Sequence, residues 1–193
     1  LKTAGYVAHH IGKWHLGMSN WGVIPKGRGF DTSLVYFEGA EDHMIQRSCN
    51  DPMCLAPITD ASSGMCPSTN ANGSCPYDLW HDDAPATELA GRRFSGYLFN
   101  DQAVANVMGH DTSNASAPLF MYLAPQSSHS PLQAPQEFVE RYPADWYLDR
   151  RLYAAMCSVW DEVLGNVTSG QGHVGHLARG LQRRQRRPRV LVD

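Results

Sequence analysis

A lysine and a histidine two positions apart, set between two glycines, are the residues of this sequence best suited to chemistry. Residues 12–17 read Gly-Lys-Trp-His-Leu-Gly and follow a short apolar run typical of a strand. On an extended backbone alternate side chains share a face, so Lys13 and His15 are predicted to project together while Trp14 enters the core. An ammonium beside an imidazole suits an oxyanion such as sulfate, phosphate or carboxylate. By spacing alone, such a pair is more often simply solvated.

Segments on both sides of this hexapeptide resemble the type I sulfatases, in the order that the family has them. Residues 1–17 resemble the family's second signature, and Gly39-Ala40-Glu41-Asp42 looks like the Gly-Ser-Glu-Asp of the arylsulfatase B branch. Residues 118–135 are similar to a strand and loop of that branch. Residues 28–32, 153–156 and 160–167 continue the resemblance, with a divergent stretch near 46–90. Several segments in order are far more specific than one. The sequence therefore resembles an internal fragment of an arylsulfatase B-like protein.

The resemblance implies roles for three residues. Lys13 would bind sulfate oxygens as a point charge, and His15 would stand beside the formylglycine hydroxyl and assist its proton transfers. His129, in the loop after the second similar strand, would contact the sulfate or protonate the departing alcohol. Taken without the resemblance, His129 is an ordinary loop histidine. The implied activity of the intact parent is hydrolysis of sulfate esters of carbohydrate or aryl substrates.

The family's nucleophile and metal ligands are expected outside this chain. In the type I sulfatases a Cys-x-Pro-x-Arg motif supplies the formylglycine, and acidic residues with Asn hold Ca²⁺, both upstream of the segment that resembles residues 1–17. Cys66-Pro67-Ser68-Thr69 lacks the intervening residue and the Arg. His81-Asp82-Asp83 is interpreted as an exposed helix N-cap cluster rather than a metal site. The chain alone is accordingly expected to be inactive, with no metal ligands of its own.

Three other functions remain open at this point. A non-catalytic sulfatase-like protein would keep the anion pocket and bind sulfated glycans without turnover. A related phosphatase or phosphodiesterase shares the fold class, so fold alone does not exclude it. A nucleic-acid binder would depend only on the Arg-rich residues 179–189 and is the weakest alternative, so no nucleic-acid partner is expected.

Charge and composition divide the 193 residues into two parts. Residues 1–168 hold 10 Lys and Arg against 18 Asp and Glu, whereas residues 169–193 hold 6 Arg against 1 Asp. Residues 1–168 are predicted to be a partial sulfatase catalytic domain, and residues 169–193 an Arg-rich, disordered tail. No apolar run approaches the ~18 residues that a membrane span needs.

Cysteines and sequons favour the secretory route, lysosomal or extracellular. Four of the five cysteines lie between Cys49 and Cys75 and predict a disulfide-stapled loop, whose pairing stays open. Cys157, on a helix, is predicted to be an inert buried thiol. Of the Asn-x-Ser/Thr sequons, those at Asn72 and Asn114 lie in loop-like sequence, whereas Asn166 ends a helix and is a weaker acceptor.

The elements that must position these residues indicate an α/β protein, a partial alkaline-phosphatase/sulfatase-like fold with a mostly parallel sheet flanked by helices. The hydrophobic pattern predicts a strand at 6–11 and another, buried on both faces, at 119–123. In such sheets ligands bind at the carboxyl edge. Residues 12–35 are predicted to be a Gly-rich loop and 36–85 irregular, and helices are expected at 85–108, capped by Asp82 or Asp83, and at 150–167.

Overall fold

The computed structural model describes residues 1–48 and 76–170, which form one mixed sheet with helices. The cysteine cluster between Cys49 and Cys75, the sequon at Asn72 and the Arg-rich segment from residue 171 onward lie outside the described residues. The strands are β1 (Val7–Lys13), β2 (Thr32–Tyr36), β3 (Trp80–His81), β4 (Ala84–Pro85) and β5 (Leu119–Ala124). The helices are α1 (Ser95–Met108), α2 (Gln136–Val139) and α3 (Leu148–Ser169), with 3-10 turns η1 (Lys2–Ala4) and η2 (Lys26–Arg28).

The sheet has the strand order β4-β3-β2-β1-β5, which confirms the α/β class. β1 lies between β2 and β5 and pairs in parallel with both. β3 and β4 form a short antiparallel hairpin added beside β2, so the described sheet is less uniformly parallel than expected. Asp82 and Asp83 are the turn of this hairpin, with Asp82 at φ 58, and they do not cap a helix.

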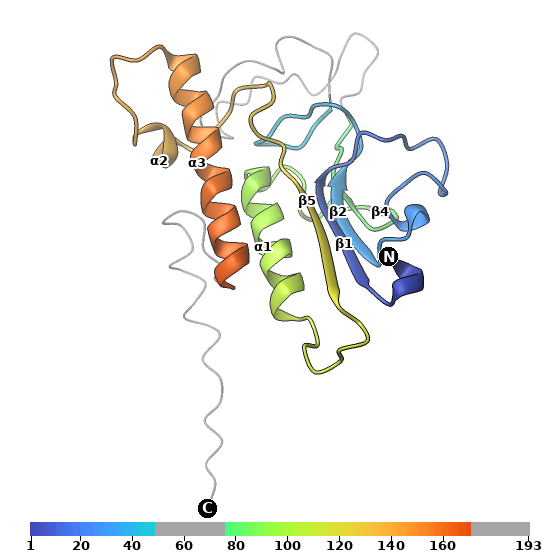
Figure 1. Ribbon diagram of the computed structural model, residues 1–193. Coiled ribbons are helices and arrows are strands. Elements are labelled where there is room, and N and C mark those ends of the chain that lie inside the picture. Colours follow the sequence, from blue (N-terminus) through green and yellow to red (C-terminus); the bar gives the residue numbers. More distant parts are fainter. Residues whose placement is uncertain (49–75, 171–193) are drawn as a thin grey trace, which may run out of the picture.

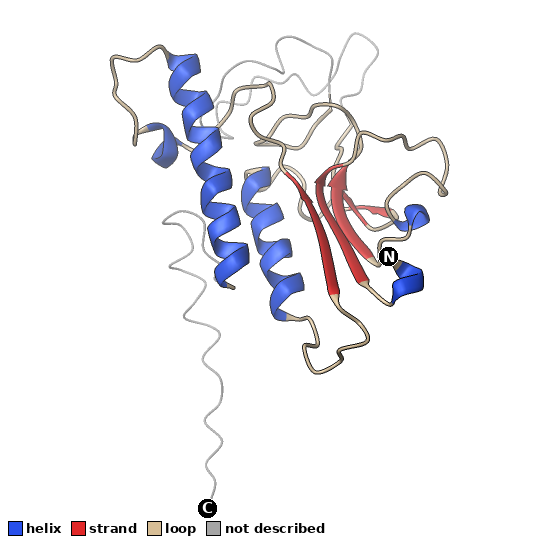
Figure 2. Cartoon of the chain, in the orientation of Figure 1, coloured by secondary structure: helices blue, strands red, loops and turns tan. Residues whose placement is uncertain are grey.

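The register of the parallel strands brings their carboxyl ends to one edge of the sheet. Lys13 at the end of β1 lies opposite Tyr36 at the end of β2, and Gly12 lies opposite Ala124 at the end of β5. The arrowheads of these three strands point the same way in Figure 2. Loops that leave the strands here occupy the edge where α/β sheets bind ligands.

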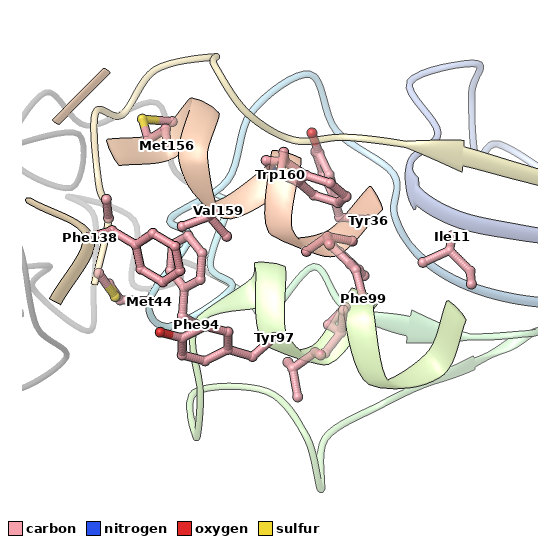
Figure 3. Packing of buried hydrophobic residues seen from close by; sticks show 14 of the residues in the cluster. Ile11, Tyr36, Met44, Phe94, Tyr97, Phe99, Phe138, Met156, Val159 and Trp160 are labelled. Atoms are coloured by element: carbon pink, nitrogen blue, oxygen red, sulfur yellow. The ribbon is translucent and has the colours of Figure 1, made fainter. Parts of the chain in front are cut away.

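Helices cover one face of the sheet and enclose the main core. Figure 1 shows α1 beside the strands and α3 beside α1, and both α1 with β1 and α1 with α3 are in contact. Aromatic rings link the sheet, α1 and α3. The ring centroid of Phe99 on α1 lies 6.4 Å from that of Tyr36 on β2 and 6.4 Å from that of Trp160 on α3 (Figure 3). Burial of such large side chains is the main force that holds helices onto a sheet.

Two predicted boundaries were wrong because short strands lay within apparently irregular sequence. β2 is buried throughout its last four residues but is only five residues long, too short for its period to stand out among glycines. The helix expected from residue 85 begins ten residues later, at Ser95, since Pro85 belongs to β4 and Gly91 takes φ 71 before the helix. The helix expected at 150–167 is confirmed as α3.

Gly12 makes the close pairing of β1 with β5 possible. Its φ is 100, and a Cβ placed there would lie 2.0 Å from the carbonyl oxygen of Ala124. Only glycine tolerates both the dihedral and the approach. The residue thus fixes the backbone at the position just before Lys13.

The face of β1 opposite the helices holds an aromatic cluster around His10. The ring centroid of His10 lies 5.2 Å from that of Trp14, 5.2 Å from Phe30 and 4.9 Å from Tyr122. Trp14 is buried, as predicted, but Tyr122 of β5 is 49% exposed. The expected burial of that strand on both faces is therefore wrong, because β5 is the last strand of the described sheet and this face of it stays open.

His10 should make folding acid-sensitive. Its Nε2 donates to the carbonyl of Lys13, and burial lowers the pKa of His10 from 6.5 to about 4. Between these values the unfolded chain binds a proton that the folded chain does not, so stability falls as the pH falls, by about 3 kcal/mol in all. In the full-length protein, His10→Phe should lose clearly less stability than wild type between about pH 7 and about pH 4.5, measured by urea unfolding.

The comparison isolates His10 because the other perturbed groups are common to both proteins. Burial raises the pKa of Glu41, and burial raises the pKa of Asp78 to about 6. These two carboxyl groups make stability rise as the pH falls, opposite to His10, but their contribution is the same in wild type and in His10→Phe. Equal losses of stability in the two proteins would show that His10 does not carry the effect.

Candidate functional site

Lys13 and His15 meet at a single residue, Gly39, beyond the carboxyl edge of the sheet. The half-buried Lys13 ammonium donates to the carbonyl of Gly39 at 2.5 Å. A Cβ at Gly39 would lie 2.9 Å from Cε1 and Nε2 of His15, so the imidazole rests on the bare glycine backbone. The ammonium of Lys13 and the imidazole of His15 therefore converge on Gly39.

They converge for a different reason from the one expected. β1 ends at Lys13, and His15 lies in the left-handed region at φ 49, so strand alternation does not continue to it. Its backbone N–H still donates to the carbonyl of Phe37 at 3.2 Å, which keeps the chain beside the end of β2. The bent backbone leaves the His15 side chain exposed at the edge of the sheet.

A buried turn follows Gly39 and carries three acidic or titratable side chains in succession. Asp42 accepts at Oδ1 from the N–H groups of Met44 and Ile45, which fixes the turn. Within residues 1–48 and 76–170, no hydrogen bond of normal geometry reaches the carboxyl oxygens of Glu41, and burial raises the pKa of this carboxyl group well above its ordinary value. Burial therefore favours the neutral, protonated form of the Glu41 carboxyl group.

His129 approaches the same turn from the loop that follows β5. Its exposed imidazole Nδ1 lies 2.7 Å from the carbonyl of Ser130, so Nδ1 carries the hydrogen and donates it. Nε2 is then the nitrogen left free to accept or deliver a proton. Burial, followed by the charge of His129, lowers the pKa of His43 to about 3, because the two imidazoles are neighbours.

The three predicted residues thus surround one turn but do not form one contact cluster. Lys13 and His15 lie on the Gly39 side, whereas His129 lies on the His43 side. The sequence did not reveal what joins the two sides. The two sides are joined by buried glutamines of the turn and of the loop that carries His129. A single Gln in a Pro-rich loop such as residues 131–136 shows no hydrophobic period, so the sequence did not single it out.

The described residues do not fit the calcium that the family implies. Among residues 1–48 and 76–170, no three His, Cys, Asp or Glu side chains gather closely enough to hold a metal ion. The carboxylate of Asp78 is committed to the N–H groups of Phe37 and Glu38, and that of Asp42 to the turn. His81 ends β3 and Asp82 and Asp83 form the hairpin turn, and these three side chains are not among any metal-holding group of the described residues.

Cys157 is exposed, not buried as predicted. Its position on α3 turns its thiol toward the loop after β5, where Sγ lies 3.1 Å from the hydroxyl oxygen of Ser128. A helical position next to the apolar stripe can face either the core or a neighbouring loop, and the sequence does not distinguish the two.

The two described sequons differ sharply in accessibility. Asn114 is exposed in the loop between α1 and β5, whereas Asn166 is buried and its Nδ2 donates to Asn100 at 3.1 Å. When the full-length protein passes through the secretory route, we expect a glycan at Asn114 and none at Asn166. Ser116→Ala should therefore remove the mass of one glycan, and Thr168→Ala should remove none, by mass spectrometry. A glycan on Asn166 would contradict the burial seen here.

The fold places a lysine and an exposed imidazole against Gly39, beyond the carboxyl edge of an α/β sheet. The family model described as Sulfatase matches residues 1–170, and the chain belongs to this family. It is 34% identical over 168 residues to mouse arylsulfatase J, covering 87% of this chain and 24% of the relative. It is 28% identical to human arylsulfatase A, covering 73% of this chain and 26% of the relative. The chain thus spans about a quarter of the length of these curated relatives.

Solved structures share the fold. A crystal structure of Ps i-CgsB in complex with k-i-k-neocarrahexaose aligns with a TM-score of 0.66 at 21% identity, covering 88% of this chain and 34% of that one. A structure of Ps i-CgsB alone aligns with a TM-score of 0.65 at 22% identity, covering 87% of this chain and 34% of that one. None of the helices in the described parts of the chain is both long and apolar enough to cross a membrane.

Proposed function

We propose that this chain is part of a sulfatase that hydrolyses sulfate esters of carbohydrate or aryl alcohols. The observation that carries the proposal is the convergence of Lys13 and His15 on Gly39 in a chain that belongs to the Sulfatase family over residues 1–170. The sequons and the clustered cysteines support a lysosomal or extracellular location.

Each of the three residues has a distinct task in this proposal. Lys13 is half-buried, so its charge is less screened by water, and it neutralises oxygens of the sulfo group where negative charge accumulates. His15 exchanges protons at the attacking side. His129, in its imidazolium form, donates the Nε2 proton to the leaving alcohol oxygen and keeps the Nδ1 hydrogen, which the carbonyl of Ser130 accepts.

The nucleophile and calcium would come from outside the described residues. The family forms its formylglycine nucleophile in a Cys-x-Pro-x-Arg motif, which the printed sequence does not contain. The activity is therefore proposed for the full-length protein and not for these 193 residues alone.

The test is release of inorganic sulfate from an aryl sulfate by the full-length protein, with the matching aryl phosphate as the competing substrate. The proposal expects sulfate release that His129→Gln strongly reduces. Preferential hydrolysis of the phosphate would identify a phosphatase instead. Retention on a chondroitin-sulfate column without any sulfate release would identify a non-catalytic glycan-binding protein.

A further inference from the structure

Three buried glutamine side chains bond to the turn that follows Gly39, one from the end of the turn itself and two from the loop that follows β5. Gln126 donates from Nε2 to the carbonyl of Glu41 at 3.1 Å, and Gln46 donates to the carbonyl of His43 at 2.8 Å. Gln133 contacts the residue between them and is described below. All three are at most 2% exposed. Hydrogen bonds in such a dry environment are strong and directional, so the turn is held from several sides at once.

Gln133 makes a two-point contact with this turn. Its Nε2 donates to Oδ2 of Asp42 at 2.8 Å, and its Oε1 accepts the backbone N–H of His43 at 2.8 Å. One planar amide group thereby donates to the buried carboxylate of Asp42 and accepts from the buried backbone N–H of His43. Removal of the amide would leave both without these partners, which is the costly case for buried polar groups.

This contact links the two halves of the proposed site. Gln133 lies four residues after His129 in the loop that follows β5, while Asp42 lies three residues after Gly39, which receives the Lys13 ammonium. The buried ring of His43 stacks 6.0 Å from Phe94, so the far side of the turn is packed against the segment that precedes α1. The turn is consequently a rigid base against which the His129 loop is docked.

We propose that Gln133 is a positioning residue for His129: its buried amide clamps the loop of residues 126–133 onto Asp42 and His43 and so fixes the His129 imidazole relative to Lys13. The proposal rests on the proposed function, because the position of His129 matters only if this imidazole acts on a substrate held by Lys13. Displacement of a reacting group by about 1 Å can cost about 100-fold in rate.

The test is a double-mutant cycle in the full-length protein with an aryl sulfate as substrate. Gln133→Met keeps the length of the side chain and removes both hydrogen bonds, and kcat/KM should fall by about 10- to 100-fold. In a His129→Ala background the same substitution should change kcat/KM by less than about twofold, because the group it positions is gone. Gln136→Met is the matched control, since this exposed amide donates to the side chain of Glu140, the residue that ends α2, and does not contact the turn.

A loss of the same size in the presence and absence of the His129 imidazole would overturn the proposal, because a general packing defect acts in both backgrounds.

Hydrogen exchange gives a readout that needs no turnover. In Gln133→Met the amide of His43 should exchange faster than in wild type and in Gln136→Met. If wild type releases no sulfate, the proposed function fails, and exchange still decides whether the clamp exists. Unchanged exchange at His43 overturns the clamp whatever the activity.

Discussion

Lys13→Met in the full-length protein is expected to lower kcat/KM for an aryl sulfate by about 10²- to 10³-fold. The substitution removes the cation that the proposal places on the sulfo oxygens, and loss of one such preorganised contact typically costs this much. Because the Lys13 side chain is only half-buried, the thermal midpoint should change little. The loss should appear mainly in kcat/KM and not in folding yield.

A matched lysine separates the local charge from the overall charge. Lys26 is exposed and donates to the carbonyl of Asp31 and to the carboxylate of Asp82, near the start of β2 and thus away from the carboxyl edge. Lys26→Met removes the same charge and should leave kcat/KM within about twofold of wild type. If both variants lose activity to the same degree, the loss reflects net charge and the assignment of Lys13 fails.

Gly12→Ala is expected to destabilise the protein severely, with loss of most soluble material. The added Cβ would lie 2.0 Å from the Ala124 carbonyl oxygen in a backbone with φ 100, so either the dihedral or the pairing of β1 with β5 must change. The dihedral alone costs about 1–3 kcal/mol, and the overlap adds to it, against a total stability of about 5–15 kcal/mol. The measurement is the thermal midpoint together with the soluble yield.

Gly165→Ala is the control for this substitution. A Cβ at Gly165 meets no other atom within 4 Å, and the residue lies inside α3, where Ala is favoured over Gly by about 1 kcal/mol. The thermal midpoint of this variant should rise or stay unchanged. A Gly12→Ala protein as stable as wild type would mean that β1 and β5 do not pair in the register described.

The local chemistry of this protein is readable from the chain itself. The strand before Lys13, the strong helix at α3 and the burial of Trp14 follow from short-range periodicity and side-chain size, which depend only on neighbouring residues. The family resemblance rests on the same local segments, and the match over residues 1–170 confirms it. What the sequence misplaced was β2, β3 and β4, because strands of two to five residues carry too few alternations to be distinguished from a loop.

Only the tertiary structure decided which distant groups meet. The bend at His15, the carbonyl of Gly39 beneath Lys13 and the contact of Gln133 with Asp42 join residues that are up to 91 positions apart. The exposure of Cys157 and the burial of Asn166 were likewise set by which face of α3 meets a neighbour. Such contacts depend on how the sheet register and helix packing bring separate loops to one edge, and no local pattern of residues encodes that arrangement.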